Sequence, residues 1–114
     1  MQLLTLVLNR IDCLADLLAK WMAAGISGTT IVDCEGMVQV LGASSIEPPP
    51  IFGALRQFLN PEREKGKLLF TVLSDAQVET AKKIINEVVG GIEKPDTGIV
   101  FTIPLTSVEG LANR

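Results

Sequence analysis

The stretch LLFTVLSDAQVETAKKIINEVVGG, residues 68–91, holds a strand, a helix start and a helix end in succession. Leu68–Leu73 is a short apolar and β-branched run, which is typical of a buried strand. Ser74 followed by Gln77 forms the capping-box pattern that begins a helix, and Gly90–Gly91 ends it. The apolar residues between them recur at the helical period: Val78, Ala81, Ile84, Ile85 and Val88. We therefore expect a strand followed by a helix that packs back on it.

The N-terminal part of the chain has the same order of signals. Gln2–Leu8 predicts a strand, Asn9 offers a helix cap, and Gly25 and Gly28 end the helix. One face of this helix carries its apolar residues: Ile11, Leu14, Leu18, Trp21 and Met22. We therefore expect a second strand–helix unit.

Two further strands complete the pattern. Thr29–Asp33 is β-branched and predicts a strand that could run on to Leu41, and Gly98–Ile103 predicts another that Pro104 closes. The halves are similar in detail, since TLVLN at 5–9 matches FTVLS at 70–74 and TTIV at 29–32 matches TGIV at 97–100. The order predicts one α+β domain over residues 1–114 with a ferredoxin-like fold: a four-stranded antiparallel sheet with two helices on one face.

The strand pattern also predicts how the sheet is covered. We expect one purely apolar face under the helices: Leu4, Leu6, Leu8, Leu68, Phe70, Val72, Ile99, Phe101 and Ile103. The other face is apolar with a threonine in the middle of three strands: Leu3, Thr5, Val7, Leu69, Thr71, Leu73, Val100 and Thr102. Because an exposed patch of this size is unusual in a monomer, we expect the second face to pack against other copies of the chain. The alternative is that residues 42–66 of the same chain cover it.

Composition narrows the class of function. The chain has 114 residues, is 47% hydrophobic and has a mean hydropathy of +0.38, which again favours an oligomer. Ten Lys and Arg against thirteen Asp and Glu disfavour a general nucleic-acid binder. No apolar run approaches the roughly 18 residues that span a bilayer, so we expect no membrane-spanning segment.

The residue types also disfavour catalysis and metal binding. Histidine is absent, which removes the commonest general base and metal ligand. Without a nucleophile–base pair or a Walker lysine, we expect that the protein is not an enzyme. Cys13 and Cys34 lack C-x-x-C spacing, so we expect reduced thiols in a cytoplasmic protein. Asp33 and Glu35 beside Cys34 are interpreted as a solvated strand end.

Residues 37–66 interrupt the domain between the second and third strands. Pro48–Pro50 predicts a stiff extended segment, and Ile51–Leu59 predicts a short amphipathic helix. Phe52 and Phe58 would either dock on the protein's own assembly or bind a partner protein, with Arg56 directed outward or into a neighbouring cleft. We keep both interpretations of this helix.

The chain resembles the P-II signalling proteins and their P-II-like relatives, a family of nitrogen regulation. The similar segments are MQLLTLVLN at 1–9, AAGISGTTIVDCEGM at 23–37, TVLSDAQVETAKKIINEVV at 71–89 and DTGIVFTIPLTSVEGL at 96–111. The resemblance implies a ferredoxin-like homotrimer whose sheets face inward, with a small effector, typically ATP or ADP, in clefts between subunits. It also implies control of a transporter or enzyme through residues 37–66, which stand where the family has its partner-contacting T-loop.

The resemblance carries a set of ligand-binding residues onto this chain: Thr30, Gly36, Gln39, Lys67, Asp96, Thr97 and Gly98. The side-chain cations of the family's phosphate site have no counterpart. Thr97 or Gly98 stands in place of the loop lysine, and Gly110 and Ala112 stand in place of an arginine pair. Backbone N–H groups of Gly90, Gly91 or Gly98 could form only a weak anion nest. Because a triphosphate needs several converging donors, we expect ATP sensing to be lost or greatly weakened.

Two other functions stay open at this point. The first is a structural or adaptor trimer that binds no small ligand. The second is a metal-tolerance protein of the CutA type, which shares the fold, although the missing histidines disfavour it. The sequence names neither the effector, nor a cofactor, nor the partner protein.

Overall fold

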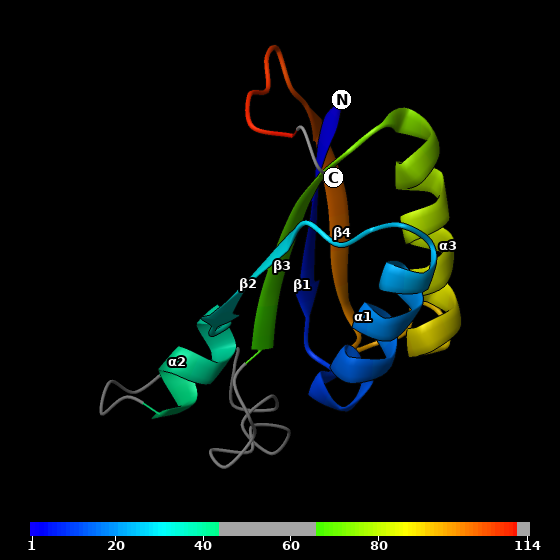
Figure 1. Ribbon diagram of the computed structural model, residues 1–114. Coiled ribbons are helices and arrows are strands. Elements are labelled where there is room, and N and C mark those ends of the chain that lie inside the picture. The colour runs from blue at the N-terminus through cyan, green and yellow to red at the C-terminus, as the bar shows by residue number, and fades with distance from the viewer. Residues whose placement is uncertain (44–65, 112–114) are drawn as a thin grey trace.

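The computed structural model describes residues 1–43 and 66–111 of the chain. The elements follow in this order: β1 (Gln2–Leu8), the 3-10 turn η1 (Ile11–Cys13), α1 (Leu14–Ala23), β2 (Thr29–Cys34), α2 (Met37–Ala43), β3 (Gly66–Leu73), α3 (Asp75–Val89) and β4 (Gly98–Pro104) (Figure 1). The strands form one antiparallel sheet in the order β2-β3-β1-β4. This confirms the α+β class and the four-stranded antiparallel sheet, and the order is compatible with a ferredoxin-like fold.

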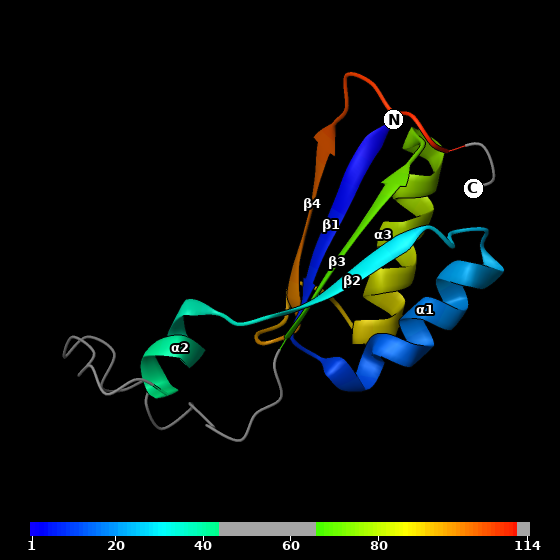
Figure 2. The same ribbon diagram turned by 60° about the vertical axis from the view of Figure 1, so that its left-hand side comes forward.

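The core lies between one face of the sheet and the helices α1 and α3, which both lie on that side (Figure 2). Its buried members come from both layers: Leu4, Leu6, Leu8, Leu69 and Leu73 from strands, and Leu17, Trp21, Val78, Ala81, Ile85 and Val89 from helices. Trp21 is fully buried, and its indole Nε1 donates a hydrogen bond to the carbonyl of Ala81 at 3.3 Å. This contact satisfies the one polar atom of the largest core side chain and joins the two helices.

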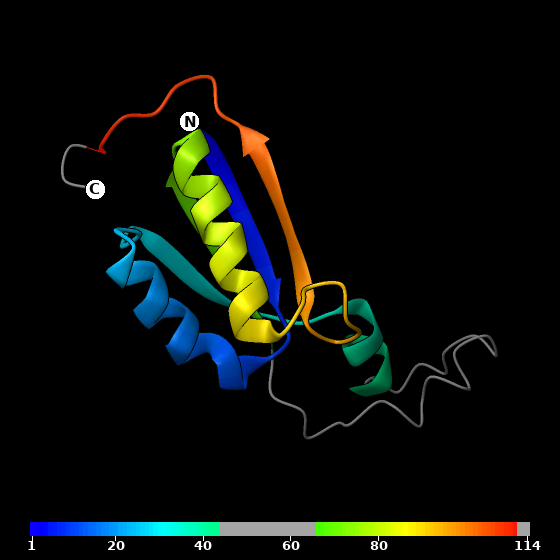
Figure 3. The ribbon, with the colours of Figure 1, turned by 90° about the vertical axis from the view of Figure 1, so that its right-hand side faces the viewer.

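The beginning and end of α3 match the sequence prediction. The Ser74 side chain accepts a hydrogen bond from the Gln77 backbone N–H at 3.3 Å, and the Ser74 N–H donates to Gln77 Oε1 at 3.0 Å. These two bonds are the capping box. Gly90 ends the helix with a φ of +76°, a left-handed conformation that favours glycine. The position of α3 over β1 and β3 is visible in Figure 3.

The strand register corrects the predicted assignment of the sheet faces. Leu6 lies beside Leu69 and Val100, whereas Thr5 lies beside Phe70 and Phe101. The helix-covered face therefore includes Leu69, Thr71, Leu73, Val100 and Thr102. The other face, which we call the open face, consists of Leu3, Thr5, Val7, Thr30, Val32, Cys34, Leu68, Phe70, Val72, Ile99, Phe101 and Ile103. The prediction was wrong for β3 and β4 because both of their faces are apolar, so alternation alone does not tell which face is covered.

Two smaller predictions are also corrected. Met22 is exposed and not part of the core, and Leu17 takes the position on the buried face of α1. Strand β2 ends at Cys34 and does not run on to Leu41, because α2 begins at Met37. The Gly36 N–H donates to Gln39 Oε1 at 3.3 Å, and the Val40 N–H donates to the Gly36 carbonyl at 3.1 Å. These local bonds satisfy the first turn of a helix.

Candidate functional site

Most of the ligand-binding residues carried over from the resemblance lie at one end of the sheet. Asp33, Lys67, Leu8 and Gly98 are consecutive cross-strand partners, so they form one row across all four strands. Gly36 and Gln39 follow β2 at this end, and Asp96 and Thr97 precede β4 there. Thr30 lies further along β2, on the open face beside Phe70.

A single chain does not bring the two halves of this set together. Gly36 and Gln39 follow β2, and Asp96–Gly98 lead into β4, but β2 and β4 are opposite edges of the sheet. With strands about 4.8 Å apart, the two edges are separated by about 14 Å. A small ligand that contacted both groups would therefore have to bind between two copies of the chain.

Lys67 is the cation of this set, and it is already paired. Its Nζ forms an ion pair and a hydrogen bond with Oδ1 of Asp33, its cross-strand neighbour. An anionic ligand would have to compete with the Asp33 carboxylate for this ammonium group. Lys67 therefore offers less to a phosphate than an unpaired lysine would.

The loop between α3 and β4 uses its own backbone donors. The N–H groups of Gly90 and Gly91 both donate to the carbonyl of Asn86, and the Ile92 N–H donates to Asn86 Oδ1 at 2.9 Å. The expected anion nest is therefore wrong for Gly90 and Gly91, because a bound anion would have to replace these bonds. The physical reason is that the last backbone carbonyls of a helix accept hydrogen bonds from the N–H groups of the residues that follow it.

The last residues of the loop hold it against the sheet. Thr97 is buried, and its Oγ1 lies 2.9 and 2.8 Å from the carbonyl oxygens of Ile92 and Lys94, to either of which it can donate its one hydroxyl hydrogen. Gly98 has a φ of +145°, and a Cβ there would lie 2.2 Å from the Val7 carbonyl oxygen. Asp96 is exposed and has a φ of +61°. Thr97 and Gly98 therefore have structural roles that the resemblance did not indicate.

The open face of the sheet is a large apolar surface. Ile99, Phe101 and Ile103 of β4 are 57%, 44% and 46% exposed, and Val32 of β2 is 46% exposed. Every strand contributes apolar side chains, and the open face as defined above includes no charged residue. The register thus makes this surface more apolar than the sequence analysis had assigned, since Phe70 and Phe101 flank Thr5 at its centre.

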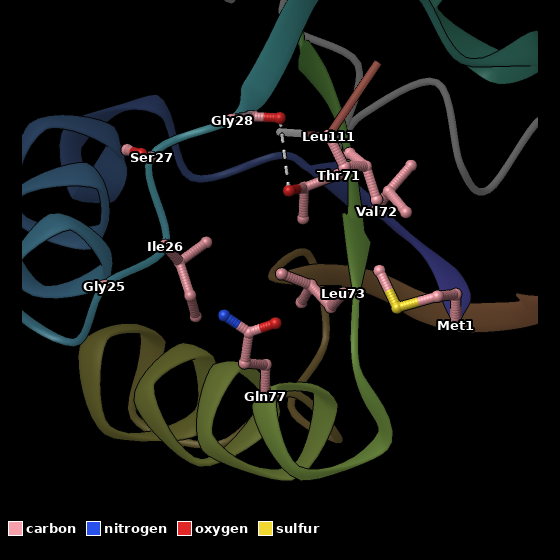
Figure 4. A pocket seen from close by; sticks show the side chains of 10 residues that line it. All are labelled: Met1, Gly25, Ile26, Ser27, Gly28, Thr71, Val72, Leu73, Gln77 and Leu111. Carbon is pink, nitrogen blue, oxygen red and sulfur yellow. Dashed lines mark hydrogen bonds between the residues drawn. The ribbon is translucent and has the colours of Figure 1, made fainter. Parts of the chain in front are cut away.

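A pocket of about 230 Å³ lies at the other end of the sheet (Figure 4). Its walls come from the α1–β2 connection, the end of β3, the first turn of α3 and two more distant residues: Met1, Gly25, Ile26, Ser27, Gly28, Thr71, Val72, Leu73, Gln77 and Leu111. The sequence analysis noted Gln77 only as a helix cap. No sequence signal indicates the pocket, because it exists only where β3 runs on past the first residue of β2.

The proposed partner-binding residues Phe52, Arg56 and Phe58 lie outside the described residues. Within residues 1–43 and 66–111, no group of three or more Cys, Asp or Glu side chains could hold a metal ion. In the same part of the chain, no helix is long and apolar enough to cross a membrane.

Comparisons with protein-family models and with curated proteins found no match to this chain.

Proposed function

We propose that this chain is a P-II-like regulatory protein with a ferredoxin-like fold. It assembles as a homotrimer in the cytoplasm, binds a small effector at the clefts between subunits and controls a transporter or enzyme through residues 37–66. It is not itself an enzyme. The proposal rests on the resemblance of the sequence to the P-II family, together with a strand order that is compatible with that fold.

The observation that carries the proposal is the open face of the sheet. Phe101, Ile99 and Ile103 lie exposed beside the half-buried Leu3 and Val7 and the buried Thr5. Leaving such a surface in water is costly, since each large apolar side chain contributes about 1.5–3 kcal/mol when it is fully buried. Packing of three such faces around one axis would bury it, and it would also bring the β2 edge of one chain toward a neighbouring chain.

The effector in this proposal is not ATP bound in the family's manner. Lys67 is paired with Asp33, and the N–H groups of Gly90 and Gly91 are bonded to Asn86. The phosphates would meet few free donors at this end of the sheet. A binding site for a ligand with less negative charge is still supported, because four of the expected ligand-binding residues are exposed or half-buried: Thr30, Gly36, Gln39 and Asp96.

A thermal-shift screen followed by calorimetry tests the proposal. The purified protein is screened against nucleotides, cyclic nucleotides, 2-oxoglutarate, bicarbonate and divalent metals. We expect no micromolar affinity for ATP with magnesium, and stabilisation by a ligand of another class. Micromolar binding of Mg-ATP would contradict the proposed loss of the phosphate site.

The second candidate is an adaptor trimer without a small ligand. The loop before β4 favours the adaptor. Its hydrogen bonds, which involve Thr97, Asn86 and Gly91, are formed within the loop and with the end of α3, so few of its donors are free for a ligand. An absence of stabilisation by every compound in the screen, combined with capture of one defined partner through residues 37–66, would favour the adaptor. Stabilisation by a metal alone would instead favour the CutA-type alternative.

A further inference from the structure

Helix α2 is short, and one of its faces carries exposed apolar side chains. Met37 and Val40 are 67% and 48% exposed within residues 1–43 and 66–111. Together with Leu41 they follow the spacing i, i+3, i+4, so the three form one side of the helix, which we call the α2 face. Figures 1 and 2 show α2 beyond the end of the sheet, apart from α1 and α3. A helix of 7 residues is stable in water chiefly when such a face packs on another element, so the α2 face requires an occupant.

The chain leaves the sheet for α2 and returns to it at the same place. Strand β2 ends at Cys34, and β3 begins at Gly66, its cross-strand partner. A Cβ on Gly66 would lie 3.4 Å from Cys34 Sγ and 3.3 Å from the Leu8 carbonyl oxygen, so the return point is closely packed. Helix α2 begins three residues after Cys34 and is about 10 Å long. Residues 44–65 therefore begin at the C-terminal end of α2 and end near its N-terminal end.

Residues 51–59 have the pattern and the length to cover this face. The sequence predicts an amphipathic helix there, with its apolar residues on one side: Ile51, Phe52, Leu55, Phe58 and Leu59. Residues 44–50 separate it from α2, which is within the range of about 2–8 residues that commonly joins two packed helices. Pro48–Pro50 would prevent α2 from continuing into it as one helix. Neither α2 nor the predicted apolar side carries a charged residue, so contact between them buries no charge.

The lengths of the segments favour an antiparallel arrangement. A helix over residues 51–59 would be about 13 Å long. If it continued in the direction of α2, its end would lie about 24 Å from the start of α2, and residues 60–65, which span at most about 22 Å, would have to be fully extended to reach Gly66. If it runs back along α2, its end lies near Met37, and residues 60–65 reach Gly66 easily.

We propose that residues 51–59 of the same chain dock antiparallel on the α2 face. Phe58 would then lie near Met37, and Phe52 near Val40 and Leu41. Because the segment is joined to α2 through residues 44–50, its effective concentration at this face is on the order of 1 mM, which favours it over a separate partner or a second copy. This inference selects the docked interpretation of residues 51–59 over direct presentation of Phe52 and Phe58 to a partner protein. It goes beyond the proposed function and does not depend on the effector or on the trimer.

The test compares the oxidation of two methionines by hydrogen peroxide in the purified full chain. Met22 on α1 is 68% exposed and Met37 on α2 is 67% exposed among the described residues, so without an occupant the two should form sulfoxide at similar rates. We expect Met37 to be oxidised at least about fivefold more slowly than Met22, because the docked segment must open before the peroxide reaches the sulfur. Tandem mass spectrometry measures the sulfoxide at each residue over time.

Substitutions in the segment identify it as the occupant. The double variant Phe52→Ser and Phe58→Ser removes both rings from the apolar side of the predicted helix, and we expect Met37 then to be oxidised within about twofold of the rate at Met22. Gln57→Ser is the matched control, because position 57 lies on the opposite side of the same predicted helix. It is expected to leave the protection of Met37 unchanged.

Methyl NMR distinguishes the protein's own segment from a second copy. In uniformly labelled protein we expect nuclear Overhauser contacts between the Met37 methyl group and the ring of Phe58. A mixture of chains labelled only at methionine with chains labelled only at phenylalanine reports contacts between copies, and there we expect none.

Three results would overturn the inference: equal oxidation of Met37 and Met22 in the unaltered chain, undiminished protection of Met37 in the double variant, or contacts between Met37 and Phe58 that arise only between copies. The first would indicate that the α2 face awaits a separate partner, and the last that a second copy covers it. The mass of the assembly and the binding of an effector are measured separately, so failure of the proposed regulatory function would leave this inference intact.

Discussion

Truncation of Phe101, which lies on the edge strand β4 beside Thr5, tests the role of the open face. In the single chain Phe101 keeps 44% of its area exposed. Because full burial of a Phe side chain contributes about 1.5–3 kcal/mol, covering this remainder would contribute about 0.7–1.3 kcal/mol for each copy. For three copies the sum is about 2–4 kcal/mol. Since dissociation of a trimer depends on the square of the protein concentration, we expect Phe101→Ala to raise the midpoint concentration of assembly about 5- to 30-fold.

Sedimentation velocity over a dilution series measures this midpoint. Met22→Ala is the matched control, because Met22 is 68% exposed but lies on α1, away from the open face. The control is expected to leave the midpoint unchanged. An unchanged midpoint in Phe101→Ala, with the control behaving as expected, would refute the assignment of the open face as the contact between subunits.

Three further predictions concern the elements that position the two ends of the sheet. Ser74→Ala removes the acceptor for the Gln77 N–H and should lower the free energy of unfolding in urea by about 1 kcal/mol. Ser74→Asp keeps an acceptor and should retain most of this stability. An equal loss of stability in the two variants would contradict the capping role. Gly98→Ala places a Cβ 2.2 Å from the Val7 carbonyl oxygen at a φ of +145°, and we expect it to lower the free energy of unfolding by at least about 2 kcal/mol. Gly36→Ala is the control, because a Cβ there meets nothing within 4 Å, and we expect it to lower the free energy of unfolding by less than about 1 kcal/mol. Asp12 accepts hydrogen bonds from Arg10, which lowers the pKa of its carboxyl below the ordinary 3.8. A lowered carboxyl pKa contributes stability that is present at pH 7 and is lost as the pH falls through that pKa. Arg10→Gln should therefore raise the pKa of Asp12 in an NMR titration and lower the stability at pH 7, but only slightly, because both partners of this ion pair are exposed.

The elements with local signals could be predicted from the sequence. The capping box at Ser74 and the glycine at Gly90 set the limits of α3, and both depend only on neighbouring residues. The face assignment of β3 and β4 could not be predicted, because Leu68, Phe70 and Leu69 are equally apolar and only the register with β1 separates them. The helix α2 was missed because Val40 and Leu41 also fit a strand, while the Gly36–Gln39 contact that begins it is visible only in three dimensions.

The candidate site, like the fold, could be predicted only in part from the sequence. The resemblance assigned Lys67 and Asp96–Gly98 to one ligand site, and the structure places Lys67 and Gly98 in one row of cross-strand partners. It did not indicate that Asp33 pairs with Lys67 or that Thr97 bonds within its own loop, because these contacts depend on side-chain positions. The pocket beside Gln77 depends on where two strands begin and end relative to each other, which no single segment encodes.

Static light scattering of the purified full chain at micromolar concentration tests the central claim most directly. The claim is that the open face around Phe101 joins three copies of the protein. We expect a particle mass of three times the 12.2 kDa of one chain. A mass of 12.2 kDa under these conditions would contradict the claim, because the exposed surface of Ile99, Phe101 and Ile103 would then remain in water.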